Sequence, residues 1–303
     1  MEYILRTNLL TKRFKQQLAV DSVSVSIERG AIYGLIGRNG AGKTTFLRMI
    51  GGLAAPTSGD IELMGYHSAD GTINNAYAKI GSLIEQPGVY KNMSAFENCR
   101  LKALCCGIDS GDYINDKLAL AGLQNVGEKA VGDFSLGMRQ RLGIAMATIG
   151  EPEFLILDEP INGLDPQGII EVRNIIRRIN TEQKITILIS SHILEELSKL
   201  ATHYGIIHNG RLLEQISHDE LLGKCTSQLE IVTDNAKTAA NVLKKFGCHY
   251  SIADERTVFV NDMADKSAAI NKALVNAGVE VESLYRHNQN LEDYFISLIS
   301  RAE

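Results

Sequence analysis

The residues with the clearest chemical potential form one short stretch, G-R-N-G-A-G-K-T, which fits the pattern G-x-x-x-x-G-K-[ST] without a gap. Glycines let the backbone wrap closely around a phosphate chain, and the loop amides point at anionic oxygens. Lys43 supplies a positive charge for the phosphates, and Thr44 offers a hydroxyl to Mg²⁺. The predicted phosphate-binding residues are Gly37, Arg38, Asn39, Gly40, Ala41, Gly42, Lys43, Thr44 and Thr45.

Two carboxylates follow an apolar run further along the chain. Phe154–Leu157 is entirely apolar, and Asp158 and Glu159 come directly after it. A buried central strand delivers its last residues to the ligand edge of an α/β sheet. We therefore expect Asp158 to hold Mg²⁺, usually through water, and Glu159 to polarise an attacking water as a general base.

The elements around the phosphate loop decide whether the motif is meaningful. The apolar run 31–36 reads as a buried parallel strand, and residues 44–50 place apolar side chains on one helical face. Strand, glycine-rich loop and helix are the setting of a phosphate-binding loop, whereas a simple glycine-rich turn needs neither flanking element. Alternating strands and helices from residue 139 to 214 predict an α/β, P-loop NTPase core over residues 1–222.

A helical insertion interrupts this alternation at about residues 88–138. Ser94 and Glu97 have the spacing of a capping box, and apolar residues then recur at helical intervals from Leu101 to Ile108. The triplet 109–111 breaks this helix, and a second short helix follows. The insertion would project from one side of the α/β core.

The last part of the chain predicts a second domain. Residues 223–303 show the order β-α-β-β-α-β followed by a closing helix, which is the pattern of an α+β, ferredoxin-like domain. This fold supports many functions, and we find no cluster of ligand-binding residues within it.

Composition narrows the range of partners and compartments. The chain has 303 residues, a formal net charge of −5 and no run rich in Lys or Arg, so nothing favours a nucleic-acid partner. No apolar run approaches the roughly 18 residues that span a bilayer. The five cysteines, two of them adjacent, do not show a disulfide or zinc pattern, and we expect reduced packing residues in the cytosol.

These motifs together resemble one family, the ATP-binding subunits of ABC transporters, over roughly residues 3–215. Residues 37–44 look like its Walker A motif and residues 154–159 like its Walker B motif. Residues 134–141 stand where the signature motif belongs, residues 162–165 resemble the D-loop, and residues 190–192 resemble the segment that carries the switch histidine.

The chain departs from the usual pattern of that family at two places. The signature normally reads Leu-Ser-Gly-Gly-Gln, and here it reads Phe-Ser-Leu-Gly-Met, so that Ser135 and Gly137 remain while the first glycine and the glutamine do not. The Q-loop position falls on Glu85, with Gln86 one step later. Both departures resemble a subgroup of exporters that protect bacteria against peptide antibiotics of the bacitracin and lantibiotic type.

The resemblance implies ATP and Mg²⁺ as ligands and a set of residue roles. Lys43 and the loop amides would hold the phosphates of one ATP, while Ser135 and Gly137 of a second chain would approach its γ-phosphate. Ser135 would also cap the helix that follows it. Thr44, Asp158 and Glu85 would hold or surround Mg²⁺, and either Glu85 or Gln86 could fill the Q-loop position.

The remaining implied roles concern the attacking water, the contact between two chains and the adenine ring. Glu159 would activate water, and His192 would contact the γ-phosphate and its developing charge. Asp165 would lie at the interface with the second chain. Phe14 would stack on adenine; without the resemblance, it reads equally as a surface turn with one buried ring.

The implied assembly has three kinds of polypeptide contact. The chain would pair with a second ATP-binding subunit, identical or not, and both would bind an integral-membrane permease at the cytoplasmic face of the membrane. Glu85 and the helical insertion would touch the permease. The function that follows is ATP hydrolysis coupled to export of a peptide antibiotic or a similar toxic compound, giving resistance or immunity.

Three other classes of protein fit the sequence less well. A soluble ABC-type ATPase acting on ribosomes or DNA usually has two cassettes in one chain or long coiled coils, and neither pattern is present. A phosphate-loop kinase or GTPase would leave the signature motif unexplained, and the guanine-binding pattern Asn-Lys-x-Asp is missing from the sequence. A non-enzymatic regulator would be expected to have lost Lys43 or Glu159.

Overall fold

The computed structural model describes residues 2–224, 227–260, 263, 266–288 and 291–302. The chain divides into two compact units, residues 1–218 and 219–303, and each is described by itself. The boundary predicted after residue 222 lies inside helix α8 (His218–Lys224). Among the described residues, no helix combines the length and the apolar character needed to cross a bilayer.

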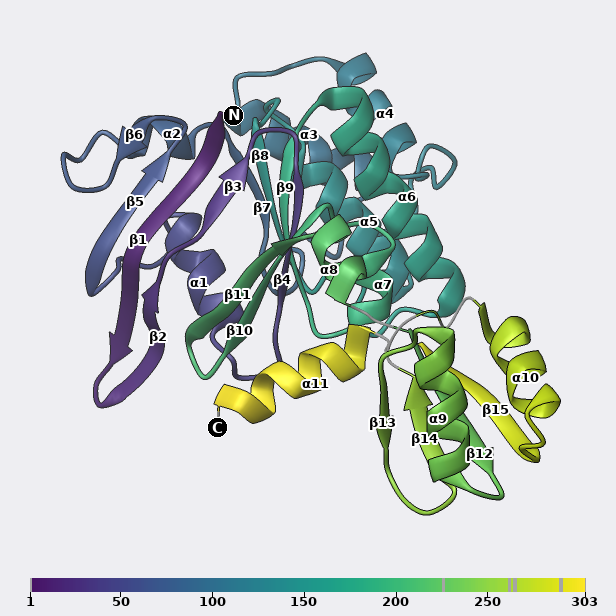
Figure 1. The fold of residues 1–303 in the computed structure, drawn as a ribbon. Helices are drawn as coiled ribbons and strands as arrows, with labels where there is room; N and C mark the ends of the chain where they lie inside the picture. The colour runs from purple at the N-terminus through teal and green to yellow at the C-terminus, as the bar shows by residue number, and fades with distance from the viewer. Residues whose placement is uncertain (1, 225–226, 261–262, 264–265, 289–290, 303) are drawn as a thin grey trace. The chain divides into compact units, whose positions relative to one another are not determined.

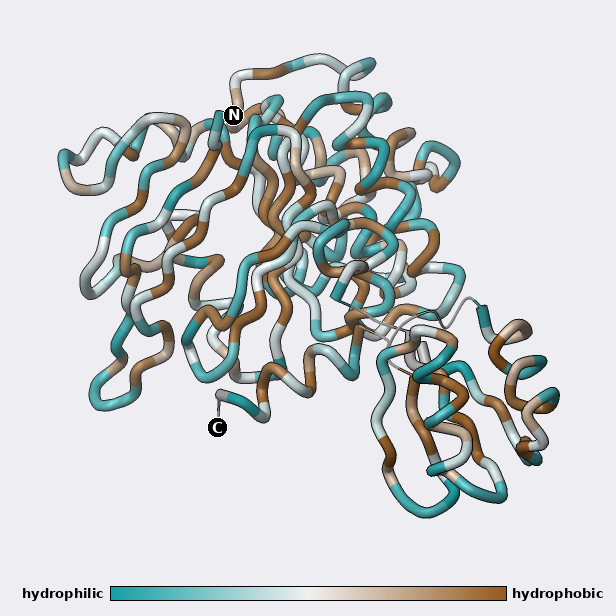
Figure 2. The backbone as a smooth tube through the Cα atoms, in the orientation of Figure 1, coloured by the Kyte–Doolittle hydropathy of each residue, from teal (hydrophilic) through white to brown (hydrophobic). Residues whose placement is uncertain are grey.

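A six-stranded sheet forms the centre of the first unit (Figure 1). Its strand order is β11-β10-β4-β9-β8-β7, and every pair is parallel except β10 with β11. Every residue of β4, β8 and β9 is buried, as expected for apolar runs covered on both faces. Figure 2 shows these central strands as largely hydrophobic. The strands are β4 (Ile32–Ile36), β7 (Ile80–Leu83), β8 (Phe154–Asp158), β9 (Thr186–Ser191), β10 (His203–His208) and β11 (Arg211–Ser217).

A second sheet, antiparallel, precedes and follows the phosphate loop in sequence. Its strands are β1 (Tyr3–Phe14), β2 (Gln17–Val23), β3 (Ser26–Glu28), β5 (Ser58–Leu63) and β6 (Tyr66–His67). Helix α1 (Lys43–Ile50) shares one hydrophobic core with both sheets, and its Phe46 and Ile50 are fully buried. Ser58 and Asp60 belong to β5 because they pair with residues of β1.

Two α-helices lie within residues 88–138, where the helical insertion was predicted, and they share a hydrophobic core with the next helix, α5 (Leu136–Ala147). Helices α3 (Ala95–Cys105) and α4 (Gly111–Leu120) are followed by a 3₁₀ turn at Val131–Asp133 and by α5. The capping box is confirmed, because the Ser94 amide donates to Glu97 Oε2 at 2.8 Å and the Glu97 amide donates to Ser94 Oγ at 3.2 Å. Short helix α2 (Asn74–Tyr77), which the pattern did not predict, precedes β7.

One expectation about the first unit is wrong, and one of its helices is short. The short helix is α7, which spans only Leu194–Ser198, because Ser191 Oγ accepts the Ile193 amide at 2.9 Å and holds this segment outside the helix. The adjacent cysteines, expected to be packing residues, are both exposed where α3 ends. The long helix α6 (Pro166–Gln183) begins with a proline, which is favoured in the first turn of a helix.

The second unit has the element order predicted for it. Its sheet is antiparallel with strand order β13-β14-β12-β15, which is the order of a split β-α-β unit. Helices α9 and α10 contribute Leu243 and Leu274 to its core. The elements are β12 (Ser227–Thr233), α9 (Ala236–Phe246), β13 (Tyr250–Ile252), β14 (Thr257–Val260), α10 (Ser267–Asn276), β15 (Val281–Asn288) and α11 (Leu291–Ala302).

Glu153 joins two cations just before β8, at the amino ends of the parallel strands. Its carboxylate accepts from Lys79 Nζ at 2.5 Å and from Arg29 Nη1 at 2.8 Å. These two contacts hold the pKa of Glu153 below its ordinary value, with the bond from Lys79 the larger cause. Residue 29 follows β3 and residue 79 precedes β7, so this carboxylate ties the two sheets together.

Replacing Glu153 with Gln should therefore lower stability in a pH-dependent way. A carboxyl group with a depressed folded-state pKa adds stability above its unfolded value, and this stability is lost as the pH falls through the folded value. We expect a loss of about 1 kcal/mol or less at pH 7, because Glu153 and its two cations are partly exposed. The difference should shrink as the pH falls below 4.5 and vanish once the pH is below the folded-state pKa of Glu153. Urea unfolding at both pH values measures this; an equal loss at both would contradict it. Glu182→Gln, which breaks one pair within a single helix, is the control.

Gly81 lets β7 pack against the end of α5. A Cβ atom at this position would lie 1.9 Å from the carbonyl oxygen of Ala147, which is backbone and cannot move aside. We expect Gly81→Ala to lower the free energy of unfolding by about 3 kcal/mol or more, as overpacking against rigid neighbours does. Gly88→Ala is the matched control, because nothing lies within 4 Å of its Cβ position. Equal urea midpoints for the two variants would refute the close contact.

Candidate functional site

The phosphate-loop motif lies between β4 and α1, as predicted. The turn needs two left-handed glycines, Gly40 at φ 80° and Gly42 at φ 102°. A side chain at Gly42 would also meet the carbonyl oxygen of Ala19 at 2.4 Å. Gly42 is the N-cap of α1 and no side chain caps it, so the first amides of the helix remain available to an anion.

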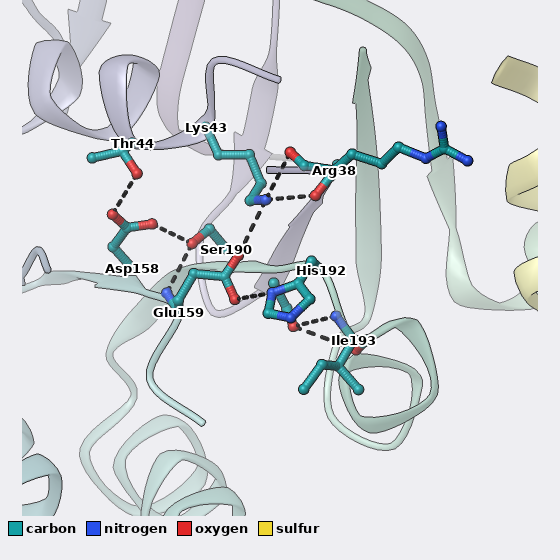
Figure 3. Close-up of polar contacts among 10 residues, drawn as sticks. Arg38, Lys43, Thr44, Asp158, Glu159, Ser190, His192 and Ile193 are labelled. Carbon is teal, nitrogen blue, oxygen red and sulfur yellow. Dashed lines mark hydrogen bonds and ion pairs between the residues drawn. The ribbon is translucent and has the colours of Figure 1, made fainter. Parts of the chain in front are cut away.

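Lys43 is buried within this loop, at 6% exposure. Its Nζ donates to the carbonyl oxygens of Gly37 at 2.5 Å and Arg38 at 3.3 Å. The same ammonium lies 3.1 Å from Glu159 Oε1 (Figure 3). The loop thus folds around its own cation and places that charge beside the carboxylate at the end of β8.

Asp158 connects three elements at the carboxyl edge of the sheet. Thr44 Oγ1 donates to Asp158 Oδ2 at 2.7 Å, and Ser190 Oγ donates to Asp158 Oδ1 at 2.5 Å (Figure 3). Asp158 is the last residue of β8 and is 4% exposed. A hydroxyl beside a buried carboxylate supplies the oxygen ligands that Mg²⁺ prefers, so the residues present fit a magnesium ion.

Glu159 stands between two nitrogen groups. Its Oε2 lies 2.7 Å from His192 Nδ1, and its Oε1, next to Lys43, is buried without a hydrogen-bond partner among the described residues. A carboxylate only accepts, so Nδ1 of His192 carries the proton in this contact. The backbone of Glu159 is left-handed, at φ 49°, and its amide donates to Ser190 Oγ at 2.9 Å.

A cavity of about 510 Å³ opens beside this cluster. Phe14, which is 50% exposed, lies in its wall, and Lys12 Nζ lies 5.1 Å from the centroid of the Phe14 ring. Stacking of adenine on Phe14 stays a prediction. The lining residues are Phe14, Gln17, Leu18, Ala19, Arg38, Asn39, Gly40, Ala41, Gly42, Lys43, Thr44, Thr45, Glu159, Asn209 and Gly210.

Sequence reasoning missed the wall formed by Asn209 and Gly210. Asn-Gly is a common sequence for a two-residue hairpin turn, and here it forms the turn between β10 and β11. The structure brings this turn under the phosphate loop, because the Gly210 amide donates to the carbonyl oxygen of Ala41 at 2.9 Å. Pairing of β10 with β4 causes this, and no local pattern reveals it.

Ser135, Gly137 and Asp165 do not line this cavity. Ser135 caps α5, as predicted, by accepting the Met138 amide at 3.2 Å. Asp165 caps α6 by accepting the Gly168 amide at 3.1 Å. Their roles toward a nucleotide on a second chain stay predictions. Gly137 lies in the first turn of α5.

Glu85 is not brought to the Thr44–Asp158 cluster. Its Oε1 lies 2.6 Å from Arg48 Nη2, at the end of α1. The role of Glu85 toward a metal ion therefore stays a prediction, and so does the choice between Glu85 and Gln86.

Comparison with known proteins places these features in context. The family model described as "ABC transporter" matches residues 20–162. The bacitracin transport ATP-binding protein BcrA of Bacillus licheniformis is 43% identical over 99% of this chain and 98% of its own length. The lantibiotic transport ATP-binding protein SrtF of Streptococcus pyogenes is 42% identical over 71% of this chain and 92% of its own length.

Solved structures agree with the fold of the first unit. A structure described as an ATP-binding subunit of an ABC transporter is 31% identical, with a TM-score of 0.63 over 73% of this chain and 92% of its own. An ATP-binding cassette solved as a dimer in a post-hydrolysis state with ADP and phosphate has a TM-score of 0.65 at 22% identity, over 71% and 98% of the two chains.

Replacing Glu159 with Gln should stop turnover and leave binding intact. The amide keeps the shape of the side chain but accepts a proton poorly, so we expect ATP hydrolysis to fall by about 10²–10⁴-fold while nucleotide stays bound. Phosphate release and retained nucleotide, measured on the same preparation, test this. Glu62→Gln, on the antiparallel sheet, should hydrolyse ATP normally. Near-normal turnover in Glu159→Gln would remove Glu159 from the role of base.

Proposed function

Because the chain belongs to the ATP-binding subunits of ABC transporters, which hydrolyse ATP, we propose that it powers export of a peptide antibiotic of the bacitracin or lantibiotic type. The observation that carries this proposal is the 43% identity with a bacitracin transport protein along 99% of the chain, second unit included. The shorter match to a lantibiotic transport protein supports the same class of cargo. A non-membrane ATPase, the alternative considered from sequence, is not favoured by these relatives.

The proposed assembly follows from the family. ATP-binding subunits of ABC transporters work with a membrane permease and form dimers. We infer that two copies, or one copy and a paralogue, close around two ATP molecules and bind the permease at the cytoplasmic face of the membrane. The dimeric cassette of the same fold supports this pairing. Ser135 and Gly137 of one chain would then face the nucleotide held by the other.

The first step is nucleotide binding. The phosphate-loop amides and Lys43 would hold the phosphates, while Thr44 and Asp158 would hold Mg²⁺, which offsets the charge of the phosphates. Binding of the anion would draw the Lys43 ammonium from Glu159 toward phosphate oxygens. Glu159 Oε1, now 3.1 Å from that ammonium, would become free to accept a proton from water.

The second step is hydrolysis. Glu159 would take the proton of the attacking water, and its contact with His192 at 2.7 Å fixes the orientation of the carboxylate. His192 Nε2, if protonated, would donate to the γ-phosphate as charge develops on it. Asp165 would contact the second chain, and Phe14 would hold the base. Product release would then reopen the dimer and reset the permease.

The function can be tested in the native host. Deleting the gene should raise sensitivity to bacitracin or to a lantibiotic, and the wild-type chain should restore growth. Lys43→Ala should fail to restore it, because the phosphates lose their principal cation, whereas Lys245→Ala, on the exposed face of α9, should succeed. Resistance is measured as the minimal inhibitory concentration. Unchanged sensitivity to every peptide antibiotic in the deletion strain would overturn the proposed cargo.

A pull-down from detergent-solubilised membranes tests the assembly separately. We expect a polytopic membrane protein to be recovered with the tagged chain in a comparable amount. Recovery with ribosomes or DNA, or without any membrane protein, would overturn the transporter assignment of this chain while leaving its ATPase activity intact.

A further inference from the structure

The contact between Glu85 and Arg48 lies close in sequence and in the sheet to the residues of the site. Glu85 has a left-handed backbone, at φ 66°, which a glutamate rarely adopts. Its carboxylate meets the Arg48 guanidinium at 2.6 Å, with the two side chains 59% and 44% exposed. Neither packing nor burial therefore requires this geometry, which points to a role in the site nearby.

Helix α1 places Arg48 directly beyond Thr44. The two residues are four apart, so their side chains share one face of the helix about one turn apart, or about 6 Å along its axis. Thr44 Oγ1 is bonded to Asp158. Arg48, which binds the Glu85 carboxylate, therefore begins one helical turn from a member of the oxygen cluster that fits a divalent cation.

The sheet brings Glu85 to the same edge from the other side. Strands β7 and β8 are parallel neighbours, and Leu83 pairs with Leu157. Asp158 directly follows Leu157, and Glu85 follows Leu83 by two residues, so both carboxylates leave adjacent strands at the carboxyl edge. Adjacent strands lie about 4.8 Å apart, which is within the reach of a glutamate side chain.

We propose that Arg48 is a positioning residue: it holds the Glu85 carboxylate off the Thr44–Asp158 cluster, so that Arg48 and a nucleotide-bound divalent cation compete for Glu85. The proposal rests on the ATPase function above. A carboxylate at this position is attracted both by a guanidinium and by a divalent cation, whereas an amide would be held weakly by either. Residue 85 is also where the chain leaves β7 toward the helical insertion, so its choice of partner changes the start of that segment.

The experiment measures metal affinity rather than turnover. The full-length chain in a Glu159→Gln background is kept in excess over ATP and titrated with Mn²⁺, and the free hexaaquo ion is followed by electron paramagnetic resonance. The effect of Arg48→Gln on Mn²⁺ affinity is measured twice, once in the chain with Glu85 and once in the chain that carries Glu85→Gln. Arg178→Gln, which breaks an exposed pair on α6, is the matched control.

The comparison between the two backgrounds isolates the contact. Loss of a positive charge near the site raises cation affinity whether or not Glu85 is present, so this part of the effect is common to both. We expect Arg48→Gln to tighten Mn²⁺ binding about two- to fivefold more with Glu85 than with Glu85→Gln, the range set by a half-exposed ion pair. This extra factor should shrink at high salt.

Two outcomes would overturn the proposal. An equal effect of Arg48→Gln in both backgrounds would show that Arg48 does not act through Glu85. Unchanged Mn²⁺ affinity in Glu85→Gln would remove Glu85 from the cation altogether. If the chain were not an ATPase, the results would differ from both of these outcomes. The wild-type complex would then lack Mg²⁺-dependent ATP hydrolysis, and Lys43→Ala would bind ATP as well as wild type.

Discussion

The carboxylate of Asp158 is the constraint on which the rest of the site depends. Asp158 is the last residue of the buried strand β8. Its two carboxylate oxygens accept hydrogen bonds from the hydroxyl of Thr44 on α1 and from the hydroxyl of Ser190 on β9. Ser190 Oγ also accepts the amide of Glu159, which fixes the direction in which the next carboxylate leaves the strand. One buried aspartate thereby aligns the phosphate loop with the residues proposed to carry out hydrolysis.

Two opposite charges stand beside each other at the end of β8. The buried Lys43 ammonium would be costly alone, and the partly buried Glu159 carboxylate compensates it at 3.1 Å. The compensation is incomplete, since Glu159 Oε1 has no hydrogen-bond partner among the described residues. A bound phosphate would offer the Lys43 ammonium a second anionic partner, in competition with Glu159.

Local signals in the sequence predicted the parts of this structure that are local. The phosphate loop, the Ser94–Glu97 capping box and the Ser135 cap depend on residues within a few positions of one another. Contacts set by sheet order were not predictable: the Asn209–Gly210 turn reaches the loop only because β10 pairs with β4, and Arg48 reaches Glu85 only because β7 lies beside β8. Helix α7 is short because Ser191 Oγ competes for a backbone amide that would otherwise enter the helix.

The ion pairs of Glu153 and the residues of the nucleotide site lie at opposite ends of the parallel strands. Glu153 sits at the amino ends of the strands, tied to Arg29 and Lys79, while the nucleotide chemistry is confined to the carboxyl ends. Each strand of the sheet separates the two by its full length. Natural variation could therefore adapt the molecule to heat or to acid by rearranging the cations around residue 153, with no change in the residues that handle phosphate.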